Sequence, residues 1–180
     1  MEEMAAEYPD VVFLHCSGYK SNDSNYTNYF GKIYEARYLS GLAAGSLTES
    51  NKIGYVAAFP IPEVIRGINA FAVGVKEVNP NATVEVVWTN TWFGPEEETQ
   101  AANALLEAGA DVLTQHQDSA STGIAAEAAG AKWIGYHTGY GQDAAPNAFV
   151  TAPVWNWGPL YTEMVNAVIN DEFTTTPYWT

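Results

Sequence analysis

The sequence predicts an α/β fold, with a mostly parallel sheet and helices on both of its faces. Three observations lead to this prediction. Short runs rich in β-branched and aromatic residues alternate with stretches of helical periodicity, the connections between them are short, and 180 residues suffice for one domain or for one large and one partial domain. Strands that alternate with helices in this way pair in parallel.

The first elements follow from local pattern. The acidic N-terminus, MEEMAAEYPD, has the character of a helix that leads into a strand, and the apolar run 10–17 predicts that strand, ended by Gly18. A polar loop follows. Apolar and aromatic residues at roughly helical spacing then predict a helix over 29–48, whose glycines at 41 and 45 favour close packing.

The remaining elements repeat one unit. Proline residues end the strand predicted at 52–60, and Pro95 with three acidic residues marks the N-terminus of a helix that Gly109 ends. The predicted strands are 52–60, 82–91, 111–117, 132–138 and 148–154, and the predicted helices are 63–78, 95–109, 121–130 and 158–171.

Composition excludes several classes of protein. The net charge of −14 disfavours binding to nucleic acid and to anionic membranes. We find no apolar run long enough to span a membrane, and no signal peptide in these residues. Cys16 is the only cysteine and is expected to be a buried small hydrophobe. The three histidines lack metal-ligand spacing, so we predict neither metal nor cofactor.

Ligands of open parallel sheets bind beyond the carboxyl ends of the strands, so the residues there are the candidates for a site. They combine aromatic rings with amides, hydroxyls and one carboxylate, a mixture that suits a flat heteroaromatic ligand. The candidate ligand-binding residues are Tyr19, Trp92, Phe93, Gln117, Asp118, His137, Trp155 and Asn156.

Each of the stronger candidates has a structural alternative. Phe93 could act as a hydrophobic staple on the helix that follows it. Asp118 could cap the helix over 121–130. His137 could be a structural histidine, and Trp155 could pack at a hinge. The acidic run Glu96–Glu97–Glu98 is interpreted as a solvated face that complements the helix dipole.

Signatures of catalysis are absent from the sequence. It contains no GxSxG, P-loop, GxGxxG or HExxH motif, and its serines and histidines have no motif context. This favours a binding module over an enzyme.

Several segments, taken in order, resemble the basic membrane protein family of ABC-transporter solute-binding proteins, the purine-nucleoside-receptor-like group. They are PDVVFLHCSGY, YFGKIYEARYLSGLAAG, NKIGYVAAFPIPEVIRGINAFAVG, NTWFGPEEETQAANALLEAGADVLTQHQDS and TAPVWNWGPLY. The resemblance implies a fold of the type I periplasmic-binding-protein kind. Residues 1–49 would then be a partial first lobe, residues 50–148 a nearly complete second lobe, and residues 149–180 the crossover back to the first lobe.

The resemblance also implies a ligand. Members bind purine-type ligands between two lobes, and Phe93 matches the position of a stacking phenylalanine. Nucleoside binders typically have an aspartate near the position of His137 and a lysine near Trp155, both serving the ribose, and a glycine-rich segment at Gln117–Asp118. This chain departs at all three places, which favours a free base such as adenine.

The sequence therefore predicts an extracytoplasmic solute-binding component of an ABC importer, with a purine-like ligand and a permease as partners. The full-length protein would meet the membrane only through the permease or a lipoprotein-type anchor. Two alternatives stay open: a sensor domain of a regulator or signalling receptor, and an α/β nucleoside-processing enzyme. The first would need a DNA-binding or signalling partner domain, and the second a cluster of carboxylates or a metal site.

Overall fold

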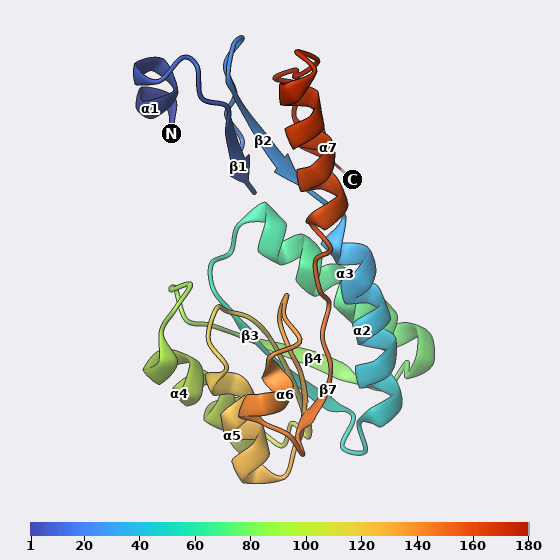
Figure 1. The fold of residues 1–180 in the computed structure, drawn as a ribbon. Helices are drawn as coiled ribbons and strands as arrows, with labels where there is room; N and C mark the ends of the chain where they lie inside the picture. Colours follow the sequence, from blue (N-terminus) through green and yellow to red (C-terminus); the bar gives the residue numbers. More distant parts are fainter. Residues whose placement is uncertain (180) are drawn as a thin grey trace. The chain divides into compact units, whose positions relative to one another are not determined.

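The computed structural model describes residues 1–179 and contains two compact units (Figure 1). Among the described residues, the smaller unit consists of residues 1–32 and 156–179, and the larger unit consists of residues 33–155. Within the described residues, no helix is both long and apolar enough to cross a membrane.

The larger unit is built on a five-stranded parallel sheet with the strand order β4-β3-β5-β6-β7. The order places β3 and β5 side by side, although β4 lies between them in sequence. The connections from these two neighbours lead toward opposite edges of the sheet, which defines a topological switch point. The strands are β3 (Lys52–Ala57), β4 (Thr83–Trp88), β5 (Val112–His116), β6 (Lys132–Ile134) and β7 (Phe149–Thr151).

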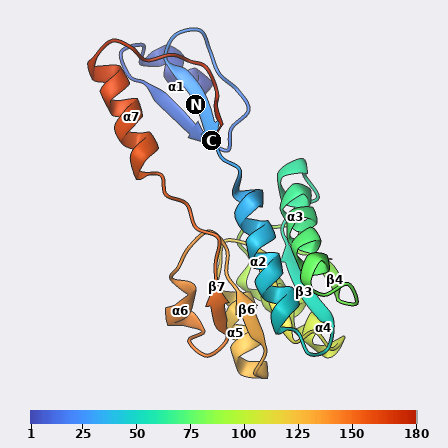
Figure 2. The same ribbon diagram turned by 90° about the vertical axis from the view of Figure 1, so that its right-hand side faces the viewer.

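Helices cover both faces of this sheet, as Figures 1 and 2 show. One face packs against α2 and α3 around Phe71 and Ile53, and the other packs against α4 and α5 around Leu105 and Trp133. Both cores are fully buried, so the sheet is apolar on both sides, as a parallel sheet requires. The helices are α2 (Ile33–Leu47), α3 (Pro62–Val78), α4 (Pro95–Glu107), α5 (Ser121–Ala129) and α6 (Gly141–Ala144).

Glycines let α2 and α3 approach backbone to backbone. A Cβ atom on Gly41 would lie 2.1 Å from the carbonyl oxygen of Phe71, and one on Gly74 would lie 2.1 Å from that of Tyr38. No larger residue fits at either position. This contact makes α2 part of the larger unit.

The smaller unit holds a three-stranded parallel sheet in the order β1-β2-β8. Asn25 joins its parts, because its side-chain amide donates to the backbone oxygens of Ala5, Tyr8 and Val11. Cys16 at the end of β1 is exposed, so the expected burial of this thiol is wrong. The elements are α1 (Glu2–Glu7), β1 (Phe13–Cys16), β2 (Tyr26–Phe30), α7 (Gly158–Ile169) and β8 (Tyr178–Trp179).

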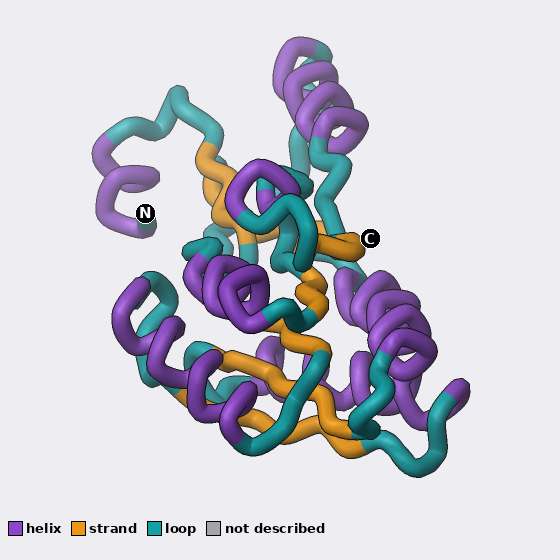
Figure 3. The backbone as a smooth tube through the Cα atoms, turned by 90° about the horizontal axis from the view of Figure 1, so that it is seen from below, coloured by secondary structure: helices purple, strands orange, loops and turns teal. Residues whose placement is uncertain are grey.

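The predicted fold class is confirmed, and the elements differ from expectation in a few places. Figure 3 shows the strands of the larger unit flanked by helices. The structure adds β2 where a loop and a helix start were expected, and it adds the short elements α6 and β8. The larger unit begins at residue 33, because α2 packs on α3. The division into a partial first and a nearly complete second lobe stays a prediction.

Candidate functional site

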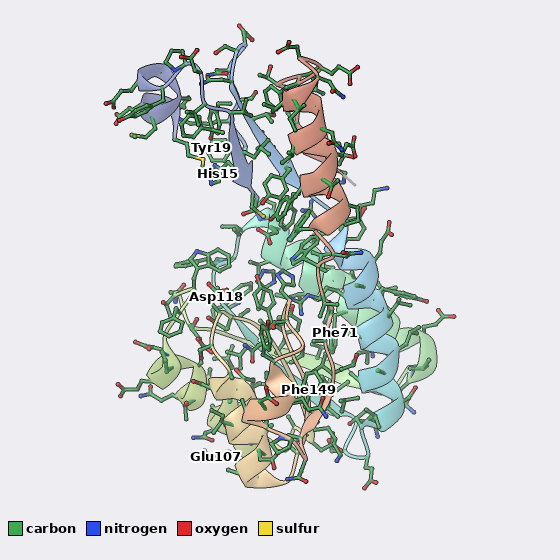
Figure 4. The ribbon with its side chains drawn as sticks, viewed as in Figure 1. His15, Tyr19, Phe71, Glu107, Asp118 and Phe149 are labelled. Atoms are coloured by element: carbon green, nitrogen blue, oxygen red, sulfur yellow. The ribbon has the colours of Figure 1, made fainter. Side chains whose placement is uncertain are left out.

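The switch point between β3 and β5 brings polar and aromatic side chains together at the carboxyl edge of the larger sheet. His116 ends β5, and its Nε2 lies 3.5 Å from Oε1 of Glu63 in the first turn of α3. Figure 4 places Asp118 at this edge and Glu107, the last residue of α4, at the opposite end of the unit. Open parallel sheets bind their ligands at this kind of edge.

Aromatic rings form a continuous series along this edge. Trp92 lies 5.5 Å from Phe59 and 6.0 Å from His116, measured between ring centroids. His116 in turn lies 4.6 Å from Tyr136, which stacks on His137 at 3.7 Å. We call the six rings that meet in this way the aromatic series: Phe59, Trp92, His116, Tyr136, His137 and Trp155, the last lying 5.3 Å from His137.

A hollow of about 430 Å³ opens beside the aromatic series, within the larger unit. This volume falls in the range of small-molecule sites. Its walls come from the segments that follow β5 and β6. The residues that line it are Gln115, Gln117, Asp118, Ser119, Ala120, Trp133, Tyr136, His137, Thr138, Tyr140 and Gly141.

Part of the lining of the hollow is held by a network of hydrogen bonds around Gln115. Its side-chain amide donates to the backbone oxygens of Gln117 and Ser119, over 3.0 and 2.5 Å. Its side-chain oxygen accepts a hydrogen bond from Nε1 of Trp133 over 3.1 Å. Gln115 is fully buried and is hydrogen-bonded through both its side-chain nitrogen and its side-chain oxygen, so it holds the segment that carries Asp118.

Three polar groups on residues that line the hollow have no hydrogen-bond partner among the described residues. The side-chain amide nitrogen of Gln117 donates to Oγ1 of Thr89, but its buried Oε1 has no partner among the described residues. Nε2 of His137 is likewise buried and unpartnered. Both are buried polar atoms that cost free energy unless something bonds them.

The carboxylate of Asp118 is the third of these groups. Among the described residues, its carboxylate accepts no hydrogen bond, whereas its backbone N–H is bonded to the carbonyl oxygen of Trp92. Although the residue is exposed overall, desolvation of the carboxyl and then the charge of Glu63 raise its pKa. A carboxylate held in this state gains from a hydrogen-bond donor placed against it.

The histidines of the site are neutral. Burial, followed by the charge of Arg37, lowers the pKa of His137 to about 2. Burial also lowers the pKa of His116, against the opposing effect of Glu63. His137 therefore offers one nitrogen donor and one acceptor to its surroundings at neutral pH.

Backbone conformation at the site is also unusual. His137 and Asn90 adopt the left-handed region, with φ of 53° and 58°. Such residues cost about 1–3 kcal/mol each unless their surroundings fix them. Asn90 lies two residues beyond the end of β4 and His137 three beyond the end of β6, and the bridge between His137 and Val154 holds His137 in place.

A buried arginine lies behind the aromatic series. Arg37 of α2 is fully buried, donates from Nη1 to the carbonyl oxygen of Gln115 over 3.1 Å, and lies 4.8 Å from the ring centroid of Tyr136. This cation–π contact and this hydrogen bond join α2 to the ends of β5 and β6.

The structure brings five of the eight predicted site residues into this region. Gln117, Asp118 and His137 line the hollow, and Trp92 and Trp155 belong to the aromatic series. Phe93 follows Trp92 and is 65% exposed. Tyr19 and Asn156 belong to the smaller unit, so their part in binding stays a prediction.

The structure excludes two alternative roles, a hydrophobic staple for Phe93 and a helix cap for Asp118. A hydrophobic staple would need an apolar residue four positions into α4, and that position holds Glu98. The N-cap of α5 is Ala120, and the side chain that bonds its first turn is Ser119, which accepts from the N–H of Ser121. Phe93 is therefore not explained by a hydrophobic staple, and Asp118 is not explained by helix capping.

Sequence reasoning missed four residues that build the site. Glu98 was interpreted as part of a solvated acidic face, but it is fully buried, so that prediction is wrong for this residue. No sequence pattern marked Glu63 or Trp133 as part of the site, because only the fold places them near the carboxyl edge of the sheet. The burial of Arg37 could have been predicted, since it shares a helical face with the small residues Gly41 and Ala44.

Metal binding finds no support in the described part of the chain. Residues 1–179 contain no group of three or more His, Cys, Asp or Glu side chains placed to hold a metal ion. His116 and His137, distant in sequence, do come within 5.8 Å of each other, but as members of the aromatic series.

A parallel α/β unit with an acceptor-bearing hollow at the carboxyl edge of its sheet is typical of small-molecule binding proteins. The family model for PnrA-like ABC transporter substrate-binding proteins matches residues 1–179, and the chain belongs to this family. The family consists of substrate-binding proteins and not of enzymes, as predicted for this chain.

Two curated relatives differ in the ligand that their names give. The chain is 45% identical over 179 residues to a putative ABC transporter glucose-binding protein of Haloferax volcanii, covering 99% of the chain and 45% of the relative. It is 38% identical over 177 residues to a purine-binding protein of Brucella abortus, covering 98% of the chain and 50% of the relative. The chain thus spans about half the length of these relatives.

A solved structure supports the fold. An ABC transporter solute-binding protein from Conexibacter woesei superposes with a TM-score of 0.76 at 25% identity, covering 98% of this chain and 60% of that one. The predicted likeness to periplasmic-binding-protein folds is therefore confirmed.

Proposed function

We propose that the larger unit binds a purine base or a purine-like heterocycle, as the substrate-recognition part of an ABC importer that works outside the cytoplasm. One observation carries the proposal: the unpartnered acceptors Asp118 and Gln117 Oε1 lie beside the aromatic series. A flat heterocycle can stack on an indole or imidazole ring while its edge N–H groups bond these acceptors.

The polarity of the hollow narrows the ligand class. No lysine or arginine lines it, and its one charged group is the carboxylate of Asp118. Such a site favours ligands with several N–H or O–H donors and disfavours anions. Nucleotides, with their phosphate groups, are therefore poor candidates, whereas adenine and guanine offer amino and ring N–H donors.

Glucose is the second candidate, and the same acceptors favour it. Hydroxyl groups are donors, and the relative from Haloferax volcanii is named as a glucose-binding protein. The two ligands differ in shape: a purine offers two flat π faces, whereas a sugar ring offers C–H groups. The length of the aromatic series favours the purine.

Isothermal titration calorimetry of the full-length protein with adenine, guanine, guanosine, AMP and glucose tests the proposal. We expect a free base to bind most tightly and AMP to bind weakest. Tight binding of glucose with no response to any base would replace the purine by a sugar. Delivery to an ABC permease follows as a further proposal, tested by uptake of the bound ligand in cells that lack the protein.

A further inference from the structure

Glu98 is a buried carboxylate that the binding surface itself does not use. It lies in the first turn of α4 beside Glu96 and Glu97, which are exposed, yet it has no exposed surface. Burial raises its pKa, and the nearby charge of Asp118 acts in the same direction. A buried carboxylate is costly unless it is fully hydrogen-bonded, so its bonds indicate why the fold retains it.

The two oxygens of Glu98 bond two different loops. Oε1 accepts from the backbone N–H of Gly94 over 3.2 Å, and Oε2 accepts from Oγ of Ser119 over 2.6 Å. Gly94 follows Trp92 and Phe93 in the β4–α4 loop, and Ser119 follows Asp118 in the β5–α5 loop. One side chain therefore connects the loop that carries the indole to the loop that carries the carboxylate.

Other bonds join the same two loops. The backbone N–H of Asp118 donates to the carbonyl oxygen of Trp92 over 2.9 Å, and the side-chain amide of Gln117 donates to Oγ1 of Thr89 over 2.5 Å. Of the side chains that bridge the loops, Glu98 and Thr89 line no part of the hollow and do not belong to the aromatic series, and Glu98 is the one that bonds both loops through its own side chain. It can be changed without touching the ligand.

We propose that Glu98 is a positioning residue, which holds Trp92 and Asp118 at a fixed separation so that one ligand meets both the ring and the carboxylate. The proposal rests on the proposed function for its effect on affinity, but the linkage of the loops is a property of the unliganded protein. Pre-organisation of this kind raises affinity because less ordering is left to the moment of binding.

Two variants of matched size separate hydrogen bonding from packing. Glu98→Met fills the same space without any acceptor for Gly94 or Ser119, whereas Glu98→Gln keeps an acceptor for Gly94 and a partner for Ser119. Glu97→Gln, an exposed change in the same turn, is the control. Ser119→Ala removes one of the two bonds from outside the helix, together with the bond that Ser119 accepts from the N–H of Ser121, and serves as a second test if Glu98→Met does not fold.

Hydrogen–deuterium exchange of the unliganded full-length protein is the first measurement. We expect Glu98→Met and Ser119→Ala to speed exchange in residues 89–94 and 117–121 together, while Glu98→Gln and Glu97→Gln leave both segments slow. Calorimetry with the base that the wild-type protein binds is the second. We expect roughly fivefold weaker binding for Ser119→Ala, which loses one bond to Glu98, and roughly thirtyfold weaker binding for Glu98→Met, which loses both, with substantial rescue in Glu98→Gln.

The outcomes separate this proposal from the proposed function. Suppose that exchange is faster in both loops of the variants, but the protein binds no base and no sugar. This result would support the linkage of the two loops by Glu98 and would contradict the proposed ligand class. Faster exchange in only one loop, or lower thermal stability with unchanged exchange and affinity, would show that Glu98 only supports the fold, and the positioning role would be wrong.

Discussion

Asp118 donates its backbone N–H to the carbonyl oxygen of Trp92 over 2.9 Å, so the residue that carries the carboxylate and the residue that carries this indole are joined through the main chain. A helix separates the two residues in sequence. The bond fixes the carboxylate beside the aromatic series, while its oxygens stay free of partners among the described residues. This relationship underlies the first predictions.

Replacement of Asp118 by asparagine should weaken ligand binding. A hydrogen bond to a charged acceptor is worth about 1.5–3 kcal/mol, which corresponds to roughly tenfold to 150-fold in affinity. Calorimetry on the full-length protein measures the change, and thermal unfolding serves as the control. An unchanged affinity would remove Asp118 from the site.

Truncation of Trp92 should also weaken binding. Stacking of a base on an aromatic ring is worth about 1–3 kcal/mol, so Trp92→Ala should lose roughly fivefold to 150-fold in affinity, and Trp92→Phe should recover part of it. Phe93 is more exposed than Trp92 and makes no ring contact with a member of the aromatic series among the described residues. Comparison with Phe93→Ala therefore shows which of these two adjacent residues contributes to affinity. Should Phe93→Ala cost more than Trp92→Ala, Phe93 is the stacking residue, as the family resemblance implies.

Ligand affinity should fall at acidic pH. The carboxylate form of Asp118 is the acceptor, and its pKa is raised by desolvation and by Glu63. Protonation therefore begins at a higher pH than for an ordinary aspartate, whose pKa is about 3.9. Calorimetry at a series of pH values should show the loss in the wild-type protein but a flatter profile in Asp118→Asn. The same slope in both proteins would assign the titration to another group.

Asp111 should stabilise the fold in a pH-dependent manner. Its carboxylate accepts hydrogen bonds from Oγ1 of Thr48 over 2.6 Å and from the N–H groups of Glu49 and Ser50 over 2.7 Å each. Burial alone would raise its pKa, but these bonds outweigh burial and lower it. The contribution is therefore fully present above the unfolded pKa, near 3.9, and is lost as the pH falls through the lower folded value.

Urea unfolding of Asp111→Asn tests this expectation. We expect a loss of about 1–2 kcal/mol in the free energy of unfolding at pH 7, from hydrogen bonds that a neutral amide cannot replace. The difference from the wild-type protein should shrink below pH 4. Asp143→Asn, at an exposed aspartate, is the control and should change little. A difference that grows at low pH would contradict the assignment.

Gly74→Ala should destabilise the larger unit by forcing α2 away from α3. The new Cβ would lie 2.1 Å from the carbonyl oxygen of Tyr38, a backbone atom that cannot move without the helix. Overpacking of this kind costs about 1–3 kcal/mol. Gly139→Ala, where a Cβ would meet nothing within 4 Å, is the matched control. Equal stability of the two variants would show that the helices separate freely.

The sequence by itself determined the α/β alternation, because strand and helix periodicities are local properties that each segment carries. It also determined the region of the site, because polar and aromatic residues that follow parallel strands must gather at one edge. Trp92, Gln117, Asp118 and His137 were placed at that edge in this way, and the structure has them there. Strand β2 escaped notice because its residues, Tyr26–Phe30, follow a polar loop and merge into the next helical pattern.

Only the tertiary structure decided which charged residues are buried. Glu98 and its exposed neighbours Glu96 and Glu97 are the same residue type in the same helical turn, and their difference arises from the position of the β5–α5 loop. The contact of Arg37 with Gln115 likewise depends on the packing of α2 against α3. Burial and pairing are properties of distant segments brought together, so a local pattern cannot specify them.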